Sequence, residues 1–315
     1  MISELELLNR MVDRHTTLPS LLKQADEHTL IVIGNGFDVA HAIKSKYNDF
    51  RTWLLAQGHE YLVNSISSFF PEIEDDIDSW GDVETAMGFY NEKAILGECR
   101  PHEEFDYDHS IQSAARVTDS VDAFFKPQLD KFRDLFVEWV NGLDINAAEP
   151  FLNLPRNAKY LSFNYTETLE QIYGIPPEHI VHIHGSRLPH GEEYVFGHFL
   201  KKSPEDVYGD EEALTFESEA HENVVRWMND WYKPTEDYIL KHRDLFWHLE
   251  DVHLVIYMGK TINKVDKDYF CEIQEHIPDD AKVYMTYHGD IEPIQIVGYL
   301  EEESLLYENW RLIRW

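Results

Sequence analysis

The stretch LIVIGNGFD at residues 30–38 decides the fold, because four apolar residues run directly into a glycine turn and then into a helical pattern near Val39. A strand, a glycine turn and a helix together form an arrangement that binds phosphate groups. Gly34 allows the tight turn, and Gly36 lets backbone approach a ligand without a Cβ in the way. The third glycine of a dinucleotide fingerprint is missing, since Val39 stands at its position, so a turn without a ligand is the alternative.

Four further apolar runs predict strands of about four to six residues. They are YLSF (160–163), IVHI (180–183), HLVIYM (253–258) and KVYMTY (282–287). Helical patterns separate most of these runs, which is the order of elements in an α/β fold. We therefore predict a Rossmann-like, mostly parallel sheet with large helical insertions.

Two long segments interrupt the alternation of strands and helices. Roughly 125 residues separate the first two strands, far more than a crossover helix needs. Their best-defined helical pattern covers residues 111–143, where Pro127 should kink or split the helix. We predict a core of residues 1–50 and 151–315, which carries a helical lobe near 204–250, and a helical insertion at 51–150.

Composition limits the classes of partner. The 315 residues, 43% of them hydrophobic, suffice for a large core. Lys and Arg number 27 against 59 Asp and Glu, a net charge of −32, so the surface repels nucleic acid at long range. The two cysteines cannot form a four-thiolate zinc site. The first residues fit no signal or transit peptide and no segment approaches the roughly 20 apolar residues of a membrane span, so we expect a cytoplasmic protein that binds neither nucleic acid nor membrane.

Polar residues follow the second predicted strand, in SFNYTETLE at 162–170. Side chains at the carboxyl end of a parallel strand face the crevice where α/β proteins bind ligands, which makes Asn164 and Thr166 candidates. Either residue could instead cap the following helix, and Asn164 has Glu167 at the spacing of a capping box. Both interpretations stay open from the sequence.

The third predicted strand ends in VHIHGS at 181–186, and a two-residue period puts His182 and His184 on one face. We expect His184 to be a general base near neutral pH at the strand end and His182 to lie further back in the core. Two alternatives are a structural role for either histidine and a zinc site completed by His190 and His198. No H-E-x-x-H pattern accompanies the histidines to favour zinc.

The fourth predicted strand also runs directly into a glycine, in MGKT at 258–261, and Asp266 comes a few residues later. The carboxyl ends of parallel strands meet at one edge of a sheet. The ends of the first, second and fourth strands should therefore converge with His184 on a single ligand site.

Five elements taken together resemble the bacteriophage abortive-infection family AbiH, from about residue 30 to residue 290: GNGFD, Trp80-Gly81-Asp82-Val83-Glu84, FNYTETLE, HIHG and the strand-glycine element with VDKDYF. More distantly, the order of glycine loop, Asn-Tyr strand end and His-Gly strand end is similar to the sirtuin-like NAD-binding domains that act as effectors in antiphage defence. That resemblance implies a sirtuin-like core, NAD held by the glycine loop, and an Asn and a His that act at the nicotinamide ribose.

Carried over by position, the resemblance implies Asn164 and His184 as the catalytic pair. It implies nucleotide binding by Gly34, Asn35, Gly36, Phe37, Asp38, Thr166, Gly185, Gly259 and Asp266. AbiH members usually carry a Gly-His-Ser-Leu-Gly-like run where this chain has GKTIN at 259–263, so only Gly259 and Asp266 keep the family pattern there. Asp38 stands where sirtuins have Ser and could reject a phosphate or bind a ribose instead.

The resemblance and the residues together predict an antiphage effector that hydrolyses the nicotinamide–ribose bond of NAD, so that infection depletes NAD and arrests growth. Cleavage of a cationic leaving group requires orientation and an admitted water more than a strong nucleophile. Asn164 would position the ribose or the water, and His184 would accept a proton. Neither role requires a metal, and we predict none.

The net charge also repels an anionic dinucleotide, so the site must attract it locally. Backbone N–H groups and a helix dipole would contribute, together with Lys44, Arg187 or Lys260.

Three alternatives belong to other classes of function. A nucleotide-binding sensor would hold NAD without hydrolysis and contact a partner through the helical insertion. Protein deacetylation would lack the four-cysteine zinc module of sirtuins. A nuclease would need Asp82 and Glu84 to share a divalent ion, yet at i and i+2 on a helix they diverge by about 200°. A phage-derived trigger, a companion defence subunit and a homo-oligomer are each compatible with the sequence.

Overall fold

The computed structural model describes residues 4–73, 78–99, 111–188, 191–203, 218–260, 262–289, 292–305 and 307–315. The chain forms two compact units: the first comprises Met1–Ser45, Leu143–Val195 and Pro234–Trp315, and the second comprises Lys46–Gly142 and Phe196–Lys233. The segment near 204–250, expected from the sequence to be one lobe on the core, is divided between them. Residues 218–233 belong to the second unit and residues 234–250 to the first, while residues 204–217 lie outside the described part.

The first unit is built on a six-stranded sheet in the order β3-β2-β1-β4-β5-β6, in which every neighbouring pair is parallel. The strands are β1 (Thr29–Ile33), β2 (Lys159–Ser162), β3 (Ile180–His182), β4 (Leu254–Met258), β5 (Lys282–Tyr287) and β6 (Trp310–Arg314). This order is that of doubly wound nucleotide-binding folds. The predicted α/β, Rossmann-like class and its parallel sheet are confirmed, and β6 is a strand that the sequence patterns missed.

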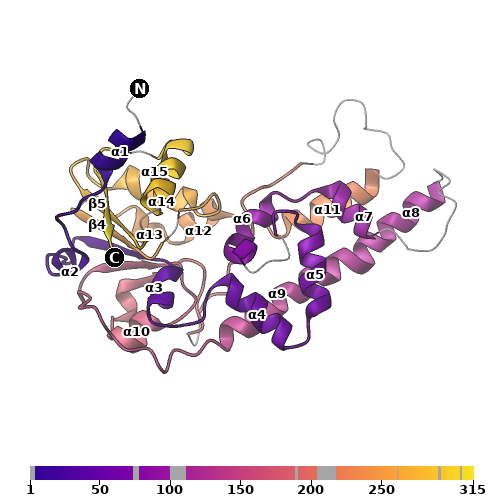
Figure 1. Cartoon of the computed structure of the whole chain (residues 1–315), viewed down its shortest axis with the longest axis horizontal. Coiled ribbons are helices and arrows are strands. Elements are labelled where there is room, and N and C mark those ends of the chain that lie inside the picture. Colours follow the sequence, from indigo (N-terminus) through magenta and orange to yellow (C-terminus); the bar gives the residue numbers. More distant parts are fainter. Residues whose placement is uncertain are drawn as a thin grey trace. The chain divides into compact units, whose positions relative to one another are not determined.

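Helices cover both faces of this sheet (Figure 1). One face carries α1 (Glu4–Met11), α12 (Thr235–Lys241), α13 (Arg243–Phe246), α14 (Lys267–His276) and α15 (Glu292–Glu302). The other carries α2 (Leu18–Leu22), α3 (Asn35–Ala40) and α10 (Thr168–Tyr173). Along β1, Val32 packs on the first face, and Ile31 and Ile33 pack on the second. A strand buried on both faces needs apolar residues at successive positions, which explains the continuous run LIVI.

The carboxyl ends of four strands lie at one level of the sheet. Ile33 of β1 is in register with Ser162 of β2 and with Met258 of β4, and Ser162 is in register with His182 of β3. The direction of the crossovers reverses between β1 and β4, which is the point where such folds bind ligands. The predicted convergence of these strand ends at one edge is therefore confirmed.

The second unit is helical. Its elements are α4 (Tyr47–Ala56), α5 (Glu60–Phe69), η1 (Asp78–Asp82), α6 (Val83–Gly88), α7 (Glu92–Cys99), α8 (Ile111–Ser120), the π-helical η2 (Val121–Phe125), α9 (Lys126–Asn141) and α11 (Ser218–Asn229). Pro127 is the second residue of α9, directly after η2. Because Pro lacks the N–H that a continuous α-helix requires, the helix predicted over 111–143 divides there as expected. Among the described residues, no helix combines the length and apolar character that crossing a membrane requires.

The residues of the W-x-D-x-E motif hold the second unit together. Trp80 is fully buried, and Asp82 Oδ1 caps α6 by accepting the Thr85 amide at 3.2 Å. Glu84 Oε1 lies 3.0 Å from Lys233 Nζ, whose side chain is completely buried, and it also accepts the Gly197 amide at 3.0 Å. The two carboxylates are thus used separately, the first as a cap and the second in a buried ion pair.

Candidate active site

The glycine loop after β1 packs against the loop after β4. A Cβ on Gly34 would lie 2.5 Å from the Gly259 carbonyl oxygen, and one on Gly36 would lie 2.8 Å from the Gly259 Cα. The Gly36 amide donates to the Gly259 oxygen at 2.8 Å. Gly259 itself has a φ of +60°, a conformation that favours glycine. The close approach of two backbones at the point of reversal therefore accounts for glycine at all three positions, whereas the sequence had attributed Gly36 to the approach of a ligand.

The side chains of Asn35 and Phe37 bond within the protein. Asn35 donates to the Ser45 carbonyl at 3.1 Å and accepts from the Ser45 hydroxyl. Phe37 is fully buried, with its ring 4.5 Å from that of His41 and 5.6 Å from that of Tyr173. Their part in nucleotide binding stays a prediction.

Asp38 joins α3 to the loop after β2. Its buried carboxylate accepts hydrogen bonds from Thr166 Oγ1 at 2.6 Å and from Thr168 Oγ1 at 2.9 Å. Burial raises the pKa of Asp38, although both hydroxyls and the Asn164 amide favour its charged form. Both oxygens of the Asp38 carboxylate thus accept hydrogen bonds from the loop that follows Asn164. Through these bonds, Asp38 and Thr166 fix the position of the Asn164 loop.

Asn164 is 5% exposed and lies just beyond the end of β2. Its backbone is held on two sides: the amide donates to Ser162 Oγ at 3.2 Å, and the carbonyl accepts from His182 Nδ1 at 3.0 Å. Within the described part of the chain, neither polar atom of its side chain has a hydrogen-bond partner of normal geometry. A buried amide left this way costs about 1–3 kcal/mol, so it calls for an explanation such as a ligand.

Helix capping does not explain Asn164 or Thr166. Helix α10 begins at Thr168, and its N-cap is Glu167. The capping alternative that the sequence left open is therefore wrong for both residues.

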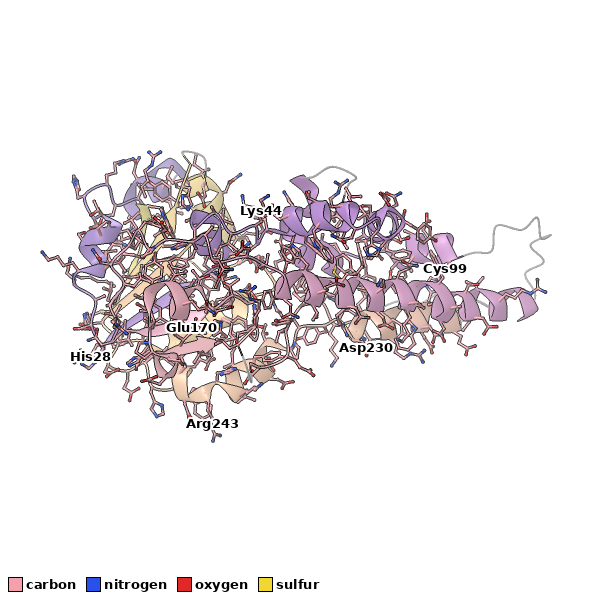
Figure 2. The ribbon with its side chains drawn as sticks, turned by 90° about the horizontal axis from the view of Figure 1, so that it is seen from below. His28, Lys44, Cys99, Glu170, Asp230 and Arg243 are labelled. Carbon is pink, nitrogen blue, oxygen red and sulfur yellow. The ribbon has the colours of Figure 1, made fainter. Side chains whose placement is uncertain are left out.

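His182 faces α10 rather than the side on which His184 lies. Its Nε2 is 2.8 Å from Glu170 Oε1, on the helix where Figure 2 labels Glu170. His184 packs instead against Tyr269 of α14, which covers the opposite face of the sheet. The expectation that both histidines share one face is wrong, because β3 ends at His182 and the chain turns before His184. Burial lowers the pKa of His182, but the hydrogen bond and charge of Glu170 outweigh burial, so its pKa lies above the usual 6.5.

The raised pKa of His182 predicts a pH-dependent contribution to stability. Its protonated ring can donate to both Asn164 and Glu170, so the stabilisation is complete below about pH 6.5, the pKa of an unfolded histidine, and is lost as the pH rises through the folded-state pKa. The free energy of unfolding of His182→Gln should fall short of wild type most at low pH, and the gap should narrow as pH rises. Denaturation at several pH values between 6 and 9 measures it, with exposed His248→Gln as control; a gap that does not change with pH would contradict the assignment.

His184 lies in the turn after β3, between two aromatic rings and a carboxylate. It is 4% exposed, and its ring centroid is 5.1 Å from that of Phe163 and 5.8 Å from that of Tyr269. Its Nε2 lies 3.5 Å from Asp266 Oδ1, and Asp266 Oδ2 accepts from Lys260 Nζ at 2.5 Å. Asp266, which the resemblance assigned to nucleotide binding, therefore joins His184 to Lys260.

Gly185 completes this turn. Its φ is +80°, and a Cβ there would lie 2.5 Å from the Glu193 carbonyl oxygen. The turn after His184 therefore requires glycine whether or not a nucleotide binds.

Two aromatic residues of the site, Phe163 and Tyr269, were not among the predicted site residues. Each is a buried apolar side chain in a strand or helix pattern, so nothing local distinguishes it from the core. Of the predicted positive groups, Lys260 joins the site, whereas Arg187 Nη2 pairs with Glu167 at 2.9 Å and Lys44 is exposed.

Zinc ligation by the histidines receives no support from their positions. Among the residues described, no group of three or more His, Cys, Asp or Glu side chains is placed to hold a metal ion. His198, in the second unit, donates from Nε2 to the Met228 carbonyl at 2.9 Å, and burial lowers its pKa to about 4. His190 lies outside the described residues, as does Thr261.

The family model described as "Bacteriophage abortive infection AbiH" matches residues 30–287, a span that runs from the second residue of β1 to the end of β5 and includes Asn164, His184 and Asp266. Neither the curated proteins nor the solved structures contain a significant match to the chain.

Proposed function

The chain belongs to the bacteriophage abortive infection family AbiH, and from this premise we propose that it acts in phage defence by hydrolysing the nicotinamide–ribose bond of NAD. Depletion of NAD would then stop growth of the infected cell. The proposal joins a defence role to a site at the carboxyl edge of a doubly wound sheet, where folds of this type bind dinucleotides.

One observation carries the proposal: the Asn164 amide is buried at this edge, close enough to Asp38 to favour its charged form, yet in the described chain neither of its polar atoms makes a hydrogen bond of normal geometry. A ribose hydroxyl or the attacking water would supply both a donor and an acceptor. The backbone of Asn164 is fixed by Ser162 and His182, so the amide is held ready before substrate arrives.

The reaction needs no covalent bond to the protein. The bond between the pyridinium nitrogen and ribose C1′ breaks, and its electron pair leaves with nicotinamide, which becomes neutral. Positive charge moves to the ribose, water adds to C1′, and the water's proton passes to His184. NAD and water thus give ADP-ribose, nicotinamide and a proton.

His184 suits the role of general base because of its neighbours. Asp266 Oδ1, 3.5 Å from Nε2, would stabilise the imidazolium once the ring has taken a proton. The rings of Phe163 and Tyr269 restrict the orientation of the imidazole. Asp266 is therefore a positioning residue for His184 in this proposal.

We expect Asn164→Ala to lower the rate of nicotinamide release about 10²- to 10³-fold, as loss of a preorganised hydrogen-bonding group does in other enzymes. Its melting temperature should stay near that of wild type, because in the described chain the removed amide is buried without a hydrogen bond of normal geometry. Nicotinamide release by the purified protein, with a lysate of phage-infected cells as the source of a trigger, measures the first effect.

The matched control is Asn157→Ala. Asn157 is exposed near the opposite end of β2 and donates to Glu27 at 3.1 Å, so its loss should leave the rate unchanged. Equal rates for Asn164→Ala and Asn157→Ala would remove Asn164 from the mechanism.

A second candidate, a nucleotide sensor without turnover, is favoured by the position of the glycine loop, which joins β1 to α3 where the strand order reverses and folds of this type bind dinucleotides. Stoichiometric binding of NAD without nicotinamide release, with and without the infected-cell lysate, would favour this sensor.

A further inference from the structure

Lys260 places a positive charge inside the first unit. Its side chain is 8% exposed, and Nζ donates to Asp266 Oδ2 at 2.5 Å. The ammonium also lies 4.2 Å from the ring centroid of Phe163 and 6.0 Å from that of Phe270. A carboxylate and the faces of two aromatic rings thus surround one cation.

An environment of one carboxylate and two aromatic rings suits an organic cation better than it suits an ammonium group. An ammonium has three N–H donors, and in the described part of the chain Asp266 is the hydrogen-bond acceptor that Lys260 Nζ contacts. Aromatic faces attract a cation through their quadrupole but accept hydrogen bonds poorly. The charged nitrogen of an N-alkylated pyridinium carries no N–H group that needs an acceptor, so such a cation would lose less on burial here.

We propose that Phe163 and Asp266 form a binding site for a flat organic cation, and that the ammonium of Lys260 fills this site in the resting protein. The proposal rests on the proposed function for the identity of the cation, which is the pyridinium ring of NAD. The ring would lie on the face of Phe163 with its charge toward Asp266 Oδ2, while Asp266 Oδ1 stays beside His184. The reacting bond would then lie near His184, whose ring is 5.1 Å from that of Phe163.

Lys260 must leave for the cation to enter, and the cost is modest. The attraction within a buried ion pair is largely offset by the cost of removing its two charges from water. Exchange of Lys260 for another cation beside Asp266 should therefore change the free energy little. The competition weakens binding of the cation without changing its reaction, and removal of Lys260 should therefore act on KM rather than on kcat.

The test uses 1-methylnicotinamide, a pyridinium cation without a ribose, and nicotinamide, its neutral counterpart, in titration calorimetry with the full chain. We expect Lys260→Met to bind 1-methylnicotinamide about tenfold or more tightly than wild type does, and more tightly than it binds nicotinamide. Addition of Asp266→Asn to Lys260→Met should abolish the preference for the cation.

Lys264→Met is the matched control, because Lys264 pairs with Glu302 and Glu303 outside this cluster, and it should bind as wild type does. Lys260→Gln, which keeps a polar side chain, should repeat the result if Lys260→Met melts at a much lower temperature. A Lys260 variant that binds the cation no more tightly than wild type, or no more tightly than nicotinamide, overturns the proposal. No turnover is involved, so NAD hydrolysis can fail while the cation site stands, and the cation site can fail while hydrolysis stands.

Discussion

Replacement of His184 by alanine is expected to lower the rate of nicotinamide release from NAD about 10²- to 10⁴-fold, the usual effect of removing a general base. The ring is buried beside Asp266 and is fixed by Phe163 and Tyr269. It can therefore accept a proton, and the Asp266 carboxylate would stabilise the imidazolium that forms. Substrate binding should change little, because the proposed role begins only when water loses its proton. Nicotinamide release under saturating NAD, together with the Kd of NAD for the variant, separates the two effects.

The control for this variant is His248→Ala. His248 belongs to the same unit but is exposed, and its Nδ1 lies 3.0 Å from the Asp244 carbonyl oxygen. A His184→Ala protein that keeps the rate of His248→Ala would show that another group accepts the proton, and would leave His184 a purely structural residue.

Replacement of Glu84 by alanine is expected to lower the free energy of unfolding of the second unit by about 3–5 kcal/mol. Lys233 would remain fully buried without its carboxylate, and the Gly197 amide would lose its acceptor as well. Most tryptophans of the chain lie in this unit, so denaturant unfolding followed by tryptophan fluorescence reports on it.

Two further variants make this prediction specific. Glu138→Ala, an exposed acid on α9, should change the free energy of unfolding by well under 1 kcal/mol. The double variant Glu84→Leu/Lys233→Met should recover much of the loss, since an apolar pair of similar volume can replace a buried ion pair. If the single and double variants lose the same free energy of unfolding, the second unit needs the Glu84 carboxylate for a reason other than its pairing with Lys233.

The periodicity of the chain predicted the central strands well, and physical reasons explain the strand that it missed. LIVI and HLVIYM are buried on both faces, so their sequences are continuously apolar. Strand β6 has the sequence WRLIR and lies at the edge of the sheet, where Arg311 and Arg314 reach the surface. An edge strand tolerates such charges, and its five residues carry no strong apolar run.

The candidate-site residues that directly follow strands could be predicted from the sequence. The contacts between segments far apart in the sequence could not. Asn164 and His184 follow strands and carry polar groups, so topology alone directed attention to them. The packing of Gly34 and Gly36 on Gly259 joins segments more than 200 residues apart, and no local pattern encodes it. The position of Asp266 between His184 and Lys260 has the same origin.

Hydrolysis of NAD is tested by incubation of the purified wild-type protein with NAD and a lysate of phage-infected cells, with both products separated and quantified. We expect equimolar nicotinamide and ADP-ribose, formed catalytically by wild type and at background level by a protein that carries both Asn164→Ala and His184→Ala. NAD that stays intact in the presence of wild type, or products that form equally with the double variant, would contradict it.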